Sequence, residues 1–173
     1  MNFFVQPTTA MRPKTSNVRY VSVALAAVFV LLAVAQLYSF EEYPSVIASL
    51  GLPGGRQLAD VYAALLVTAE VLAVPFLLSM QLSPAMRAVS MVLGWLVIVS
   101  WLIVAVFINV TINAITNSGV LGATLPVTPG WWMVCCFIGL GILAAWSSWG
   151  MWPVYDTSKL TERRAHNDES KKV

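Results

Sequence analysis

The chain has few charged residues. Of its 173 residues only 10% are Asp, Glu, Lys or Arg, whereas hydrophobic residues make up 58%. Soluble domains rarely have this composition. The formal net charge is +2, and half of the charged residues, of both signs, lie in the C-terminal tail. A basic tail beside a membrane indicates topology, and we therefore predict no nucleic-acid binding.

Residues that bind metals or form redox pairs are also scarce. Cys135 and Cys136 are adjacent, and the sole histidine is His166. Neighbours on a helix point about 100° apart, so this cysteine pair does not suit a disulfide. The chain has no C-x-x-C spacing, Ser/His/Asp grouping or phosphate-binding loop. We predict no metal site and no independent catalytic activity, and we interpret both cysteines as small buried apolar residues.

Long apolar runs are abundant instead. Four of them reach the roughly 20 residues that a spanning helix needs, at 18–40, 59–80, 86–108 and 131–152. Backbone groups in lipid must be hydrogen-bonded within the segment, which favours helices over open strands. We predict an all-α, four-helix transmembrane bundle over 18–152, flanked by tails at 1–17 and 153–173. The first run imitates a secretory signal, but it continues past the cleavage-like Ala33-Val34-Ala35, which favours retention.

The basic residues predict the orientation. Nine of the ten Lys and Arg residues lie before or at the start of the first run, at the start of the third run, or after the fourth. Only Arg56 lies in the other two connections. By the positive-inside rule both termini are expected in the cytoplasm. The connections 41–58 and 109–130 are then on the outer side.

The connections differ in character. Ser83-Pro84 fits the start of a helix, so the second and third runs should be antiparallel neighbours. The 41–58 connection has the pattern of a short amphipathic helix on the outer surface. The 109–130 connection either caps the outer mouth of a cavity or is a plain solvated loop. The candidate contacts for a partner on the outer surface are Glu41, Glu42, Tyr43, Pro44 and Arg56.

Glu70 is the one charged residue deep inside an apolar run, with no basic residue at its depth. A carboxylate in a bilayer is energetically costly and usually has a functional or structural reason. Counting from the outer ends of the runs places Ser100 and the indoles of Trp95 and Trp101 at its level. We expect a neutral, hydrogen-bonded carboxyl that either ties two helices together or holds a ligand or proton.

Several short motifs resemble a known family. They are Phe40-Glu41-Glu42-Tyr43-Pro44, Leu50-Gly51-Leu52-Pro53, Ala69-Glu70-Val71-Leu72 and Ser83-Pro84-Ala85-Met86-Arg87. Together they resemble the DoxX-like superfamily of four-helix membrane proteins. The loop at 117–132 looks most like the branch named for methylamine utilisation (MauE). Its segment 118–122 keeps both glycines of that branch's C-G-C-F-G-like turn and lacks both cysteines, which puts thiol chemistry in doubt.

The resemblance implies an accessory or assembly subunit in the inner membrane of a prokaryote, supporting a redox or exported partner protein. The broader DoxX branch implies instead a quinone-linked subunit in which Glu70 hydrogen-bonds the quinone or relays a proton. A small transporter is a third alternative, since four spans with one buried acid could form half of a dimeric pathway. We expect the lipid bilayer and a membrane or exported protein as partners, with a homo-oligomer left open. Quinone is the one cofactor considered.

Overall fold

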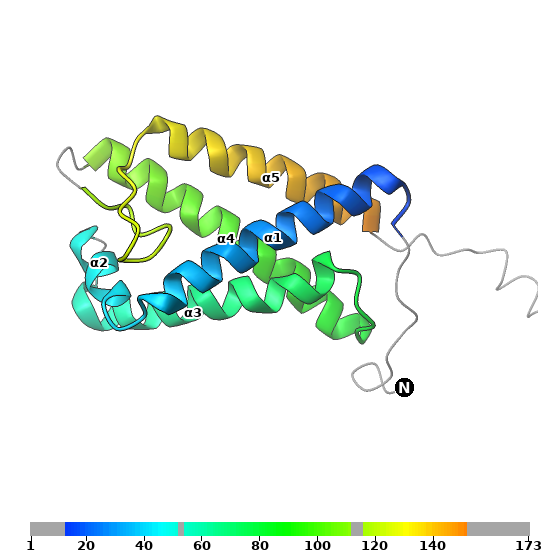
Figure 1. Ribbon diagram of the computed structural model, residues 1–173, viewed down its shortest axis with the longest axis horizontal. Helices are drawn as coiled ribbons and strands as arrows, with labels where there is room; N and C mark the ends of the chain where they lie inside the picture. The colour runs from blue at the N-terminus through cyan, green and yellow to red at the C-terminus, as the bar shows by residue number, and fades with distance from the viewer. Residues whose placement is uncertain (1–12, 52–53, 112–115, 152–173) are drawn as a thin grey trace, which may run out of the picture.

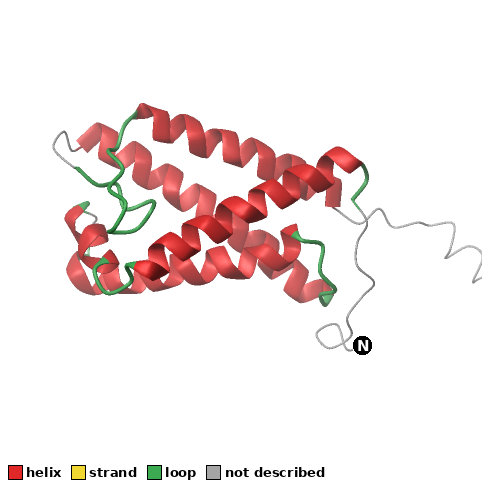
Figure 2. Ribbon diagram, in the orientation of Figure 1, coloured by secondary structure: helices red, strands yellow, loops and turns green. Residues whose placement is uncertain are grey.

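The computed structural model describes residues 13–51, 54–111 and 116–151, in which all regular structure is helical (Figures 1 and 2). Its elements are α1 (Ser16–Tyr38), α2 (Tyr43–Ser49), α3 (Gly55–Leu77), α4 (Pro84–Thr111) and α5 (Trp131–Met151). All but α2 are long and apolar enough to cross a membrane. Their bounds lie within four residues of the predicted runs. The prediction of a four-helix membrane bundle is confirmed.

The four long helices pack in a ring. α1 contacts α3 and α5, and α4 contacts the same two helices. At one end, which we call the α2 end, lie α2 and the connection from α4 to α5 (Figure 1). At the opposite end the Lys14 N–H donates to the Gly150 carbonyl at 3.2 Å, which joins the start of α1 to the end of α5. Neighbouring helices in the ring therefore run antiparallel.

The short helix α2 lies against α3 at the α2 end. Its inward face carries Tyr43 and Ile47, and Leu50 follows at its C-cap; all three side chains are buried. Removing such side chains from water is strongly favourable, so they hold α2 to the bundle. The short surface helix predicted in the 41–58 connection is present.

The described part of the connection from α4 to α5, residues 116–130, is fixed against the bundle. Within it, the Ser118 N–H donates to the Val127 carbonyl at 2.8 Å. The Ala123 N–H donates to Ser39 Oγ at 2.8 Å, which attaches the connection to the end of α1. At Gly122 the backbone is left-handed (φ +75°), and a Cβ there would lie 2.7 Å from the Ala35 carbonyl. This segment, residues 116–130, is therefore attached to the bundle end and is not a plain solvated loop; we call it the cap.

A proline lies inside α3, and a neighbouring helix supplies hydrogen bonds beside it. Pro75 has no N–H to donate within the helix. The Ser90 hydroxyl from α4 accepts from the Phe76 N–H at 3.2 Å and donates to the Leu72 carbonyl at 2.5 Å. Side-chain hydroxyls commonly satisfy backbone groups in this way within membranes. α3 therefore continues past the proline while tied to α4.

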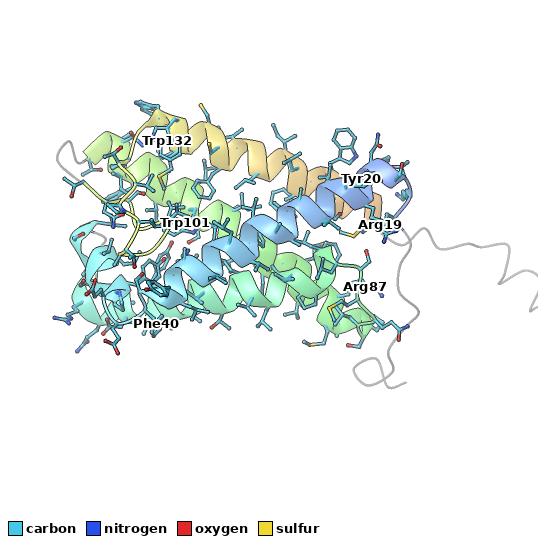
Figure 3. All side chains as sticks on the ribbon, viewed as in Figure 1. Arg19, Tyr20, Phe40, Arg87, Trp101 and Trp132 are labelled. Atoms are coloured by element: carbon cyan, nitrogen blue, oxygen red, sulfur yellow. The ribbon has the colours of Figure 1, made fainter. Side chains whose placement is uncertain are left out.

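Large apolar side chains cover the outside of the ring, as in a protein surrounded by lipid. Trp131 and Trp132 are exposed at the start of α5, and Trp149 is exposed near its end. Tryptophan favours the two membrane interfaces, so these positions mark the edges of the apolar band. Arg19 and Arg87 lie at the end opposite α2 (Figure 3). The molecule is a multi-pass membrane protein.

Candidate functional site

Glu70 faces the inside of the bundle. It lies on α3 and has no exposed surface. Its Oε1 accepts a hydrogen bond from Gln36 Nε2 of α1 at 3.1 Å and a longer one from Trp101 Nε1 of α4 at 3.5 Å. Figure 3 shows Trp101 within the bundle. The carboxyl therefore connects three helices through neutral donors.

Gln36 links the carboxyl to the cap. It lies in the last turn of α1, and its Nε2 also donates to the Val120 carbonyl at 3.1 Å. Both amide hydrogens of Gln36 are thereby used. Because its two acceptors come from α3 and from the 116–130 connection, one side chain couples the position of the cap to that of Glu70.

Trp101 is held in place from the other side. Its ring is fully buried and stacks on Phe137 of α5, with ring centroids 6.0 Å apart and an interplanar angle of 12°. Aromatic pairs of this kind contribute beyond their buried area, by about 0.5–1.5 kcal/mol. The contact with α5 thus helps to orient the indole N–H toward Glu70.

Tyr43 completes the surroundings of the carboxyl from α2. Its side chain has no exposed surface. Burial, and after it the charge of Glu70, raises the pKa of the Tyr43 hydroxyl above its ordinary value of 10.0. Tyr43 is therefore protonated at neutral pH.

Four buried side-chain atoms have no hydrogen-bond partner within the described residues: Gln36 Oε1, Tyr43 Oη, Glu70 Oε2 and Ser118 Oγ. No other side-chain nitrogen or oxygen that is buried in the described ranges lacks a partner. Buried polar groups are nearly always satisfied in folded proteins, so such a concentration is unusual. Each of these oxygen atoms can accept a hydrogen bond or coordinate a cation.

The structure gives two of the predicted neighbours of Glu70 other partners. Ser100 Oγ is 2.6 Å from Tyr62 Oη, and the Trp95 indole donates to Ser148 Oγ at 3.3 Å. If all helices ended at one level, Glu70 would lie level with Val30 of α1. The actual partner on α1 is Gln36, six residues or about 9 Å farther along. α3 starts beyond the end of α1, beside α2. A residue of α3 is therefore level with a residue nearer the end of α1 than equal counting from both ends predicts.

The predicted contacts on the outer surface divide into two groups. Glu41, Glu42 and Arg56 are exposed, and Pro44 is half-buried. Tyr43, by contrast, lies in the core because the first turn of α2 directs its ring inward. Only the other members of this set remain candidates for contact with another protein.

The cysteines were predicted to be buried, and this is wrong. Cys135 and Cys136 are both exposed. The buried face of this part of α5 is formed by Met133, Val134 and Phe137, and the two residues between them point away from the bundle. No group of three or more His, Cys, Asp or Glu side chains that could hold a metal ion occurs in residues 13–51, 54–111 and 116–151. His166 lies outside these residues.

Sequence reasoning missed Gln36 and Ser118. A signal existed for Gln36, which is the one carboxamide between Val18 and Phe40. An amide inside a spanning helix has the same need for a partner as the carboxylate, so the two could have been paired. Ser118 lies in a polar connection, where a buried serine has no distinguishing pattern.

Comparisons with known proteins add no assignment. No protein-family model, curated protein or solved structure matches the chain. The resemblance to the DoxX-like superfamily and its MauE branch therefore stays a prediction.

Proposed function

We propose that the chain is an accessory or assembly subunit that recognises a partner redox or exported protein through its α2 end. The supporting observation is that the exposed charges of Glu41, Glu42 and Arg56 flank a short helix which buried side chains fix to the bundle. Charges on a rigid surface give a partner specificity and orientation, because little conformational freedom is lost on binding.

We further propose the inner membrane of a prokaryote as the location, with both termini in the cytoplasm. The basic residues support this orientation, since Lys14, Arg19 and Arg87 lie at the end opposite α2 and Arg56 alone lies at the α2 end among the described residues. The α2 end would then face exported proteins.

Purification from native membranes in native lipid, followed by mass spectrometry, tests the proposed role. A companion protein should be retained by the wild type and reduced by the double change Glu41→Gln and Glu42→Gln. The matched control is Glu70→Gln, the same chemical change inside the bundle, which should retain the companion if the bundle stays folded. The absence of any stoichiometric companion with the wild type contradicts the proposal.

A second candidate, a quinone-linked subunit, rests on a different observation. An apolar groove on the outside of α1 is lined by Val30, Leu31 and Val34 and by Leu121 and Leu125 of the cap. The cap also contacts Gln36 through Val120, so the groove adjoins the surroundings of Glu70. An isoprenoid chain suits the groove, and a protonated Glu70 or the Tyr43 hydroxyl could donate to a quinone carbonyl. A bound quinone supplies electron-transfer chemistry, while these residues would hold its headgroup.

The quinone content of the purified protein tests this candidate. Glu70→Gln and Val34→Trp, which fills the groove, should both lower bound quinone per chain, and Glu41→Gln should not. Unchanged quinone in both variants excludes the candidate.

A further inference from the structure

The four residues that carry the unpartnered oxygen atoms are neighbours in the fold and are called the cluster below. Gln36 and Glu70 are hydrogen-bonded to each other. Gly119, which follows Ser118, lies against Tyr43, since a Cβ placed on it would be 3.8 Å from Tyr43 Cε2 at the hydroxyl-bearing edge of the ring. Val120, the next residue, accepts from Gln36. The segment 118–120 of the cap thus lies against both Tyr43 and Gln36.

The cluster contains one acidic group and no base. The basic residues of the described chain lie before α1 or in the first turns of α1, α3 and α4. The nearest in sequence, Arg56, precedes Glu70 by 14 residues, or about 21 Å of helix. An ionised carboxylate without a counter-charge is unfavourable at a site from which water is excluded. A guest with a single positive charge would neutralise it.

The chemistry of the four atoms indicates which guest. Two hydroxyls, one amide oxygen and one carboxylate oxygen form an all-oxygen set, which suits hard cations. A divalent ion would leave a net positive charge buried, because the set has only one carboxylate. We propose that Gln36, Tyr43, Glu70 and Ser118 form a binding site for a monovalent cation, with Na⁺ as the ion to test.

Other guests satisfy fewer of the four atoms. A proton on Glu70 Oε2 changes that atom into a donor but brings no partner to Ser118. A quinone carbonyl only accepts hydrogen bonds, so it offers nothing to Gln36 Oε1. A water molecule can bond to all four atoms but leaves the carboxylate charge uncompensated. A monovalent cation matches the four atoms in the kind of ligand that it prefers and matches the single carboxylate in charge.

Thermal unfolding of the full chain in lipid nanodiscs tests the site. The midpoint is measured in sodium chloride and in choline chloride at equal ionic strength, and bound radioactive sodium is counted. The midpoint temperature of the wild type should rise with Na⁺ concentration and then level off, because an ion that binds only the folded state stabilises it by mass action. One sodium ion should be bound per chain. Tyr43→Phe and Ser118→Ala each remove one ligand and should weaken Na⁺ binding by about tenfold or more.

Two charge-neutralising variants form the matched pair. Glu70→Gln should lose Na⁺-dependent stabilisation, whereas Glu41→Gln, an exposed residue near the same end, should keep it. Because Glu70→Gln could fail to fold, the tyrosine and serine variants, which keep the carboxylate, give an independent readout.

Equal midpoints of the wild type in the two salts overturn the proposal, as does stabilisation by Na⁺ that Glu70→Gln retains. Stabilisation that depends on pH but not on Na⁺ identifies a protonated carboxyl instead and also overturns it. The partner-binding role does not depend on any of these results.

Discussion

Replacing Gln36 with leucine removes both hydrogen bonds through which α1 holds Glu70 and the cap. Glu70 Oε1 keeps only the Trp101 contact at 3.5 Å, and the Val120 carbonyl loses its Gln36 donor. A buried polar group left without a partner costs about 1–3 kcal/mol in water-soluble proteins. Hydrogen bonds between membrane helices average about 0.6 kcal/mol and reach about 1.7. Leucine also eliminates the unpartnered Gln36 Oε1, which offsets part of the loss, so we expect about 1–2 kcal/mol of destabilisation.

A double-mutant cycle with Glu70→Leu isolates the Gln36–Glu70 hydrogen bond. The free energy of unfolding is measured in mixed micelles by circular dichroism as denaturing detergent is added. The coupling energy should be about 0.6–1.7 kcal/mol. Thr68→Val on the same helix is the control, since Thr68 is exposed and bonds only to its own helix at Ala64, and it should change stability by less than about 0.5 kcal/mol. A coupling energy of zero refutes the reasoning.

Three further predictions concern the rest of the fold. Ser90→Ala should lower the free energy of unfolding by about 1–2 kcal/mol, because both backbone bonds across the proline turn of α3 are lost; a change below the error of the measurement contradicts this role. Gly122→Ala should destabilise far more than Gly55→Ala, because both residues are left-handed but only the first would also meet a backbone carbonyl, at 2.7 Å; equal effects in thermal unfolding rule out a close-packed cap. Finally, burial and the charge of Glu70 raise the pKa of Tyr43, so the unfolded chain releases a proton that the folded chain keeps, and stability should fall as pH rises above about 10. Tyr43→Phe should shift the alkaline unfolding midpoint to higher pH, and an unshifted midpoint would show that Tyr43 ionises without unfolding.

The long elements of this fold could be predicted from the sequence because membranes constrain them strongly. A spanning helix needs a minimum length and an apolar composition, and each of the four runs meets both requirements. Ser83 and Pro84 start α4 as predicted, with Ser83 Oγ accepting from the Met86 N–H at 3.3 Å. Such local signals do not depend on how the helices meet.

The surroundings of Glu70 were harder to predict because they depend on how far the helices are offset along one another. Counting residues from level ends matched Glu70 with Val30 of α1, whereas α3 overhangs α1 and meets Gln36 instead. On α4 the same count placed Trp101 correctly, but Ser100 next to it bonds to Tyr62. Cys135 illustrates a second limit, because a helix that is apolar on all sides does not reveal which face meets lipid. Its exposure became visible only once α5 was packed.

The orientation of Glu70 in a lipid bilayer is the central claim, and solid-state nuclear magnetic resonance tests it most directly. With the Glu70 carboxyl carbon and the side-chain nitrogens of Gln36 and Trp101 isotopically labelled, we predict dipolar contacts from the carboxyl to both nitrogens. The Gln36→Leu variant should lose the first contact and keep the second. Magnetisation transfer from lipid chains to the carboxyl, with neither nitrogen contact, would place Glu70 on the outside of the bundle and contradict the account.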